Sequence, residues 1–198
     1  TSWLMFRLRT SGQVDSSFAN NGIFTFWIPG WQQHTIGHIQ MQGNDRIIAA
    51  ACHNNSSEGV LDVFRMKLNG AFDSSFANNL VFKHTFMQKN YFTKYAKLAL
   101  DSAQGIVAMA YGAHFPHPNP SNKGHTIVRL SKDGTLLTEF NTTGYKTYYN
   151  ARNISVDSTY NFGSTDKLGR IARLTSGKII LAGTVYRDNE TKREIGIT

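Results

Sequence analysis

A seven-residue sequence, DSSFANN, occurs twice in this chain of 198 residues, first at Asp15–Asn21 and again at Asp73–Asn79. The two copies lie 58 positions apart, and the residues before them also match. Phe6-Arg7-Leu8 aligns with Phe64-Arg65-Met66, and Gly12 aligns with Gly70. Self-similarity at a period of roughly sixty residues indicates a tandem array, in which each unit buries its apolar face against its neighbours.

A third, weaker copy follows in register at an offset of 64 and lacks the shared aspartate. Val128-Arg129-Leu130 takes the place of Phe64-Arg65-Met66, but Leu137 stands where the other copies have aspartate. The second half of each unit repeats as well, in three aliphatic runs that begin at Ile47, Ile106 and Ile179. These matches divide the chain into units at 1–59, 60–123 and 124–193, and residues 194–198 read as the start of a further strand.

Each unit contains about four short runs rich in β-branched and aromatic residues, bounded by Gly, Asn, Asp or Ser. In the first unit these runs are Leu4–Leu8, Ile23–Phe26, Thr35–Met41 and Ile47–Cys52. Four antiparallel strands form one propeller blade. We therefore expect an all-β chain of about three tandem four-stranded blades, as a β-propeller or a propeller-like array. Residues 95–100 fit either a strand or a helical turn.

The combined pattern of an Arg-Leu strand, a Gly turn, Asp-x-x-Phe, Gly and the strand Gly177-Lys178-Ile179-Ile180-Leu181-Ala182-Gly183 resembles the delta-60 repeat family. That family occurs mostly in exported or surface proteins of bacteria. The resemblance covers nearly the whole chain and implies a β-propeller-like fold. It also implies an extracellular, cell-surface or periplasmic location, and it says almost nothing about chemistry.

The aspartate and phenylalanine that the repeats share have structural explanations. Asp15 and Asp73 follow a Gly turn, where a carboxylate can accept hydrogen bonds from nearby backbone N–H groups. The aromatic side chain three residues later is expected to fill the core between blades, at Phe18, Phe76 and Phe140. We prefer this interpretation to calcium binding or catalysis.

Insertions in repeat proteins map to loops, and loops on one face often bind a partner. The insertion at 111–125 contains three of the four prolines together with His114, Phe115 and His117. A second insertion at 148–166 and a Pro-Gly turn between two tryptophans supply further candidates: Tyr148, Tyr149, Arg152, Tyr160, Phe162, Trp27 and Trp31. Such rings can stack on sugars or enter a pocket of a protein. The alternative is that they pack the loops onto the blade edges, which we favour for the tryptophans.

Motifs for catalysis, cofactors and metals are missing from the sequence. There is no HExxH, P-loop, GxSxG or dinucleotide fingerprint. His114 and His117, with His125 nearby, lack a cysteine beside them, and the prolines restrict their convergence on a metal. The single cysteine, Cys52, follows an apolar run and is interpreted as a buried structural thiol. We expect neither a cofactor nor a metal.

The net charge of +8 leaves an anionic partner open, but the basic residues are scattered, which argues against nucleic acid. No apolar run approaches the ~20 residues that a membrane-spanning helix needs. The chain opens with Thr1 and has no signal-peptide pattern, so we expect a processed product, a cleaved fragment or an excised piece.

Two functions of different classes follow. The first is a non-catalytic binding module of an exported or cell-surface bacterial protein, which holds a protein or glycan through loops on one blade face. The alternative is a hydrolase, lyase or cofactor-bearing propeller whose axial site is completed by further blades, an analogy at the level of fold. A structural subunit that self-associates through open blade edges is a third option.

Overall fold

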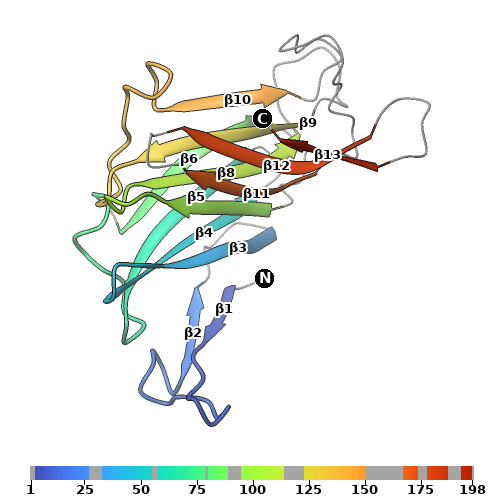
Figure 1. Cartoon of the computed structure of the whole chain (residues 1–198). Coiled ribbons are helices and arrows are strands. Elements are labelled where there is room, and N and C mark those ends of the chain that lie inside the picture. The colour runs from blue at the N-terminus through green and yellow to red at the C-terminus, as the bar shows by residue number, and fades with distance from the viewer. Residues whose placement is uncertain are drawn as a thin grey trace.

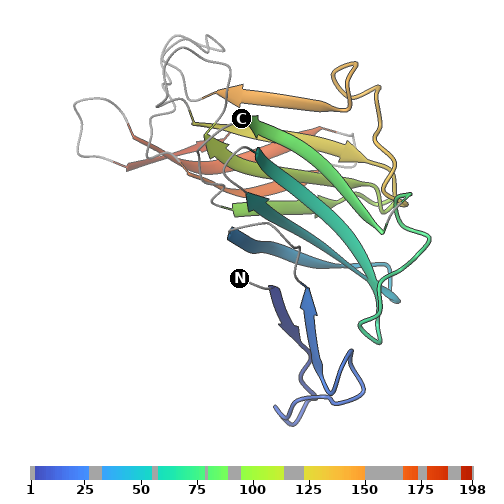
Figure 2. The same cartoon turned by 180° about the vertical axis from the view of Figure 1, so that it is seen from behind.

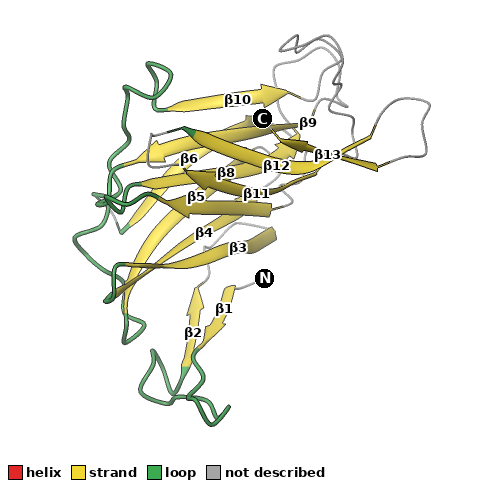
Figure 3. Ribbon diagram, in the orientation of Figure 1, coloured by secondary structure: helices red, strands yellow, loops and turns green. Residues whose placement is uncertain are grey.

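The structure is a computed structural model that describes residues 3–26, 33–54, 58–78, 80–88, 95–113, 123–149, 167–173, 178–186 and 193–197. Within these residues it contains thirteen β-strands and no helix (Figure 3). The expectation of an all-β chain is confirmed. Residues 95–100, for which a helical turn was the alternative, form a strand.

The strands form four antiparallel sheets (Figures 1 and 2). The first sheet pairs β1 (Trp3–Phe6) with β2 (Ile23–Phe26). The second has the order β3 (Gln33–Gln42), β4 (Arg46–Asn54), β5 (Glu58–Lys67), β6 (Val81–Gln88). The third has β7 (Tyr95–Leu100), β8 (Ile106–Ala113), β9 (Lys123–Leu130) and β10 (Tyr145–Tyr149) in the same order. The fourth contains β11 (Lys167–Arg173), β12 (Ile179–Tyr186) and β13 (Arg193–Ile197).

The sheets are out of phase with the sequence repeat. The first two strands of the repeat, β1 and β2, form a sheet of their own, whereas the next two, β3 and β4, begin the following sheet. Two sheets therefore have the four strands expected of a blade, and the sheets at the two ends have two and three. A sequence repeat can be divided at any position. The hydrogen-bond pairing of the strands, and not the alignment of the repeats, therefore decides where a sheet begins.

Three apolar clusters fill the spaces between successive sheets. The first joins β1 and β2 to one face of the second sheet and includes Trp3, Phe24, Phe64 and Met66. The second cluster lies between the two four-stranded sheets, where the small residues of β4 and β8 allow close approach. The third connects β7–β9 with Ile171 and Ile179 of the last sheet. Each four-stranded sheet is thus apolar on both faces.

The connections fall into two sets, because consecutive antiparallel strands alternate in direction. The connections after β1, β5 and β9 carry the repeated Gly turn and the DSSF sequence or its equivalent. The strands β2, β8 and β10 end at the opposite end of the sheets, where the chain passes on to the aromatic insertions. The two kinds of sequence feature are therefore separated by the length of the strands.

Candidate functional site

The connection after β1 is organised by Asp15. One oxygen of its carboxylate accepts hydrogen bonds from the backbone N–H of Ser17 (3.1 Å) and the Ser17 hydroxyl (2.7 Å). The other oxygen accepts a bond of 2.9 Å from Nε of Arg7, whose Nη2 donates to the Ser17 hydroxyl at 2.9 Å. The Arg7 guanidinium also lies 5.2 Å from the ring centre of Phe18. One carboxylate thus caps the turn and holds the arginine over the aromatic ring.

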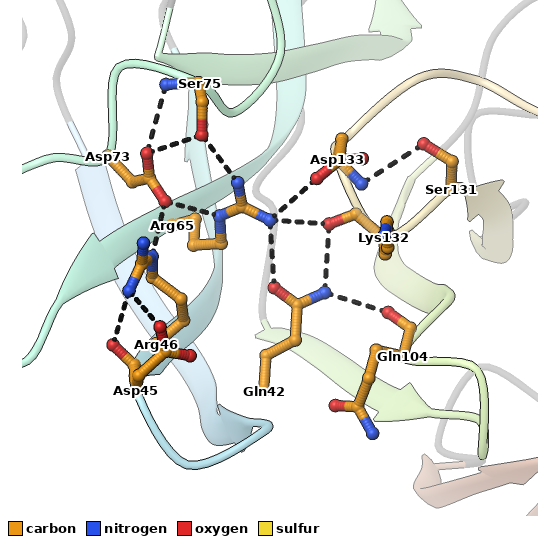
Figure 4. Close-up of polar contacts among 10 residues, drawn as sticks. All are labelled: Gln42, Asp45, Arg46, Arg65, Asp73, Ser75, Gln104, Ser131, Lys132 and Asp133. Atoms are coloured by element: carbon orange, nitrogen blue, oxygen red, sulfur yellow. Dashed lines mark hydrogen bonds and ion pairs between the residues drawn. The ribbon is translucent and has the colours of Figure 1, made fainter.

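The second unit repeats this arrangement with deeper burial (Figure 4). One carboxylate oxygen of Asp73 accepts hydrogen bonds from the backbone N–H of Ser75 (3.1 Å) and from the Ser75 hydroxyl (2.7 Å). The other carboxylate oxygen accepts a hydrogen bond of 2.9 Å from Nε of Arg65. Arg46, at the start of β4, donates to the same oxygen at 2.7 Å. The Asp73 side chain is 4 % exposed, against 19 % for Asp15. Two guanidinium groups therefore share one nearly buried carboxylate.

The pKa of both carboxyl groups follows from these contacts. Burial by itself would raise the pKa of Asp73, but the hydrogen bonds from Ser75 and Arg46 and the charge of Arg65 hold it well below its usual range. The hydrogen bonds from Ser17 lower the pKa of Asp15, with Arg7 adding to the effect. Both groups are anions at neutral pH, and their acceptor oxygens are occupied by the protein itself. Their role in this structure is to fix the turn.

The arginines of the first two units, Arg7 and Arg65, each reach the Gly turn of the following unit. Nη1 of Arg65 donates to the backbone oxygen of Lys132 at 2.9 Å and lies 3.2 Å from the Asp133 carboxylate. Gln42 joins the same junction, since its Nε2 donates to the Lys132 oxygen at 3.0 Å and to the Gln104 oxygen at 2.8 Å (Figure 4). One unit earlier, Arg7 Nη1 donates to the backbone oxygen of Leu68. Positions 68 and 132 are equivalent in the repeat.

A backbone hydrogen bond and a glycine complete each junction. The N–H of Ala19 donates to the Asn69 oxygen at 2.6 Å, and the N–H of Ala77 donates to the Asp133 oxygen at 2.9 Å. A Cβ atom built on Gly134 would lie 2.8 Å from the ring of Phe76, and one on Gly70 would lie 2.7 Å from the Ala19 side chain. The turn of each unit therefore docks closely against the aspartate loop of the unit before it. We name this set of contacts the unit junction.

The third unit keeps the backbone of this loop without the carboxylate. The N–H of Leu137 donates to the Arg129 oxygen at 2.9 Å, and that of Phe140 donates to the Leu137 oxygen at 3.0 Å, as in the other two units. Phe140 is only partly buried, whereas Phe18 and Phe76 are 1 % and 0 % exposed. Asn141 has a φ of 54°, close to those of Ala19 and Ala77. The backbone of this loop thus keeps the same conformation although Leu137 stands in place of the aspartate.

A histidine–aspartate pair lies buried between β4 and β5. Nδ1 of His53 is hydrogen-bonded to the Asp62 carboxylate, and both side chains are 0 % exposed. Burial raises the pKa of Asp62, and the contact with His53 opposes that effect. Cys52, the neighbouring residue in β4, is also buried, and burial together with the charge of Asp62 raises the pKa of its thiol well above the ordinary value. This arrangement keeps Cys52 in its neutral, unreactive form.

An aromatic cluster marks the end of the third sheet from which the insertions depart. The rings of Tyr95 and Tyr111 are stacked with centres 5.2 Å apart, and the Tyr111 ring centre is 4.6 Å from that of His125. The Tyr95 hydroxyl is 3.1 Å from Nε2 of His125. Tyr111 and His125 are 2 % and 1 % exposed, so this cluster is part of the core. It forms a rigid base at the start and end of the 111–125 insertion.

A hollow of about 780 Å³ lies beside the junction between the second and third units. Its walls come from the β5–β6 and β9–β10 connections, the start of β6 and Phe26 of β2, and they are mostly apolar, with Lys83 and Asp133 as charged members.

The structure brings the repeat residues together and describes only part of the loop candidates. Tyr148 and Tyr149 lie in β10, paired with His125 and Gly124 of β9. The remaining loop candidates lie outside the described residues: Trp27, Trp31, His114, Phe115, His117, Arg152, Tyr160 and Phe162. The predicted binding surface of the insertions stays a prediction.

Sequence reasoning missed the partners of the shared aspartate. Arg7 and Arg65 were aligned only as part of a repeated strand, although the invariant spacing of eight residues to Asp15 and Asp73 was visible. Gln42 and Arg46 carried no such signal, because the third and fourth strands of the first unit, in which they lie, become the first two strands of the next sheet. A constant Arg–Asp spacing on the two sides of a tight turn could have indicated the ion pair.

Among the described residues, no group of three or more His, Cys, Asp or Glu side chains could hold a metal ion. The described part of the chain also has no helix long and apolar enough to cross a bilayer. Comparison of the chain with protein-family models, with curated proteins and with solved structures found no match in any of the three.

Proposed function

We propose that this chain is a non-catalytic binding module of an exported or cell-surface bacterial protein, built as a propeller-like array of delta-60 type repeats. Its ligand is a glycan or a protein, held by the insertions at 111–125 and 148–166. The observation that carries this proposal is that the two ends of the sheets differ. The residues that the units share form the unit junction at one end, and the strands that lead into the aromatic insertions finish at the other end.

The described geometry supports this proposal in two ways. The charged groups of the repeat are already bound to each other, since the carboxylates of Asp15 and Asp73 are surrounded by arginine and serine donors. The Tyr95, Tyr111 and His125 cluster provides a rigid base for the first insertion. Variable loops on a rigid scaffold are the usual location of a binding site.

The test is binding of the purified chain to an array of neutral and anionic bacterial glycans. Replacing Phe115, Arg152 and Tyr160 together with alanine should lower the affinity at least about tenfold, because aromatic and arginine side chains dominate such contacts. The thermal midpoint should change little. A glycan that binds both proteins equally well would refute the role of the insertions.

The matched control is a triple alanine variant at the opposite end of the sheets. Thr10, Leu68 and Lys132 occupy equivalent positions in the three Gly turns, and Leu68 and Lys132 accept at the unit junction through their backbone oxygens. This variant should bind as the unchanged chain does. If no glycan binds, the unchanged chain and the two triple variants are each cross-linked to surface-protein fractions, which tests for a protein ligand. Equal cross-linking of all three proteins would refute binding of a protein by the insertions.

A further inference from the structure

The hollow beside the junction between the second and third units has two apolar walls, which pack against different parts of the core. Phe26 and Phe72 form one wall, with ring centres 5.2 Å apart, and both contact the apolar cluster between the first and second sheets. Phe82 and Leu136 form the other wall and contact the cluster between the two four-stranded sheets. All four side chains are only partly buried. The core therefore holds both walls in place, and part of their apolar surface remains open to a bound molecule.

The size and the lining of the hollow are those of a site for a small molecule. Its volume of about 780 Å³ lies within the range of roughly 300–1,000 Å³ that such sites occupy. Their walls are mostly apolar and aromatic, and a few polar groups fix the orientation of the ligand. The polar groups of this hollow therefore indicate the class of ligand.

Two charged residues line the hollow, and one of them already has a partner of opposite charge. Asp133 Oδ1 lies 3.2 Å from Nη1 of Arg65 (Figure 4). Lys83 is exposed and forms no ion pair with the residues that the structure describes. Asp62 faces Lys83 across the β5–β6 pair, but its carboxylate is fully buried and bound to His53. The charge that remains available in the hollow is positive and favours an anionic ligand.

Lys83 is a departure from the repeat. The equivalent residue in the other units is threonine, Thr25 at an offset of 58 and Thr147 at an offset of 64. Each of the three is the third residue of its strand, in β2, β6 and β10. Threonine is among the residues that strands prefer, and lysine is not. The fold of the unit therefore gives no reason for the charge at this position.

Leu80 is a second departure, and it lines the same hollow. It has a φ of 67° where Gly22 and Gly144 have 89° and 82°. Glycine adopts this left-handed conformation freely, whereas it is unfavourable for leucine. Leu80 is nevertheless 38 % exposed, so burial in the core does not account for it. Unfavourable backbone conformations of this kind are concentrated at functional sites.

We propose that this hollow binds a small organic acid that has an apolar body and one carboxylate. The body lies between the two apolar walls and contacts Leu80, and the carboxylate pairs with the Lys83 ammonium. Removal of the body from water favours binding, and the ion pair selects an acid over an uncharged molecule of the same shape. The proposal rests on the described residues of the hollow and not on the glycan or protein ligand proposed for the insertions.

Isothermal titration calorimetry of the full chain with biphenylacetate tests the site. This probe has two aromatic rings and one carboxylate, and biphenylacetamide is its uncharged counterpart. The acid should bind at least about threefold more tightly than the amide, because only the acid can pair with Lys83. Equal affinity for the two probes overturns the proposal, as does the absence of binding of the acid at millimolar concentration.

Two substitutions that restore the residues of the other units separate the charge from the apolar contact. Lys83→Thr should lower the affinity for biphenylacetate at least about threefold and leave the affinity for biphenylacetamide unchanged. Leu80→Gly should lower the affinity for both probes by the same factor, because it removes apolar surface and no charge. Each new residue is the one that the other two units carry at that position, so both variants are expected to fold.

Lys146→Thr is the matched control. Lys146 is an exposed lysine on β10 and is not among the described residues that line the hollow. This variant should bind biphenylacetate as the unchanged chain does. An equal loss of affinity in Lys83→Thr and Lys146→Thr would overturn the proposal, because it would show that the acid responds only to the net charge of the chain. A loss in Lys83→Thr that is equal for the acid and the amide would overturn the pairing of the carboxylate with Lys83.

Discussion

The three glycines of the Gly turns allow the energy of the unit junction to be measured in isolation. Gly12, Gly70 and Gly134 share a left-handed backbone with φ between 82° and 84°. Replacing any of them with alanine therefore adds the same conformational cost, about 1–2 kcal/mol. What differs is the environment of the new methyl group.

At Gly12 the methyl group meets nothing within 4 Å, so the conformational cost is the whole effect. At Gly134 it would lie 2.8 Å from the ring of Phe76, which is fully buried and cannot move aside freely. At Gly70 it would lie 2.8 Å from the backbone nitrogen of Ala19. Overpacking of this kind adds about 1–3 kcal/mol. We expect Gly70→Ala and Gly134→Ala to lose that much more free energy of unfolding than Gly12→Ala.

Urea unfolding followed by tryptophan fluorescence measures the three differences in free energy of unfolding. The slopes against urea should agree between variants, so that midpoints can be compared directly. Equal losses of unfolding free energy in the three variants would refute the reasoning, because they would mean that the Gly turns do not pack against the preceding units. A larger loss at Gly12 would refute it as well.

Further predictions concern Asp73 and Cys52. Asp73→Asn should cost about 3–5 kcal/mol in urea unfolding, because it leaves two guanidinium groups without their anion, and Asp15→Asn should cost less because that side chain is more exposed. The folded pKa of Asp73 is depressed, so its contribution is present above the unfolded value of about 3.9 and is lost as pH falls toward the folded value. Unfolding curves of the unchanged chain should therefore lose stability on acidification, and Asp73→Asn should show a flatter dependence; parallel curves would contradict this. Cys52 should resist a disulfide reagent in the folded chain and react once per chain in denaturant, since its thiol is buried with a raised pKa; rapid reaction of the folded chain would contradict its placement.

The strand content of the chain could be predicted from the sequence because the relevant signals are local. The run Ile23–Phe26 is a strand with the predicted bounds, and Thr35–Met41 lies within the longer β3. β-branched and aromatic residues between turn formers are sufficient to indicate such runs. Phe18 and Phe76 are 1 % and 0 % exposed, and each lies in an apolar cluster between two sheets.

The membership of strands in sheets could not be predicted, because it depends on contacts between units. Nothing local in the sequence says that β3 pairs with β4 and β5 rather than closing a sheet with β1 and β2. The same reason conceals Arg46, which reaches Asp73 from another repeat. Leu80 holds a φ of 67° where Gly22 and Gly144 stand in the other units, so a glycine pattern alone misses this bend.

Main-chain oxygens accept hydrogen bonds at both unit junctions, and the Asp133 carboxylate is an additional side-chain acceptor at one of them. The shared main-chain contacts have a consequence for how such an array can change over generations. The residues before the shared glycine are Thr10-Ser11, Leu68-Asn69 and Lys132-Asp133, which have little in common as side chains. Arg7, Arg65, Ala19 and Ala77 contact their carbonyl groups. A duplicated unit can therefore diverge at these positions without losing its fit to the next one, provided that the bend itself is kept. Neighbouring units recognise a backbone shape, which leaves the surface of each unit free to acquire its own chemistry.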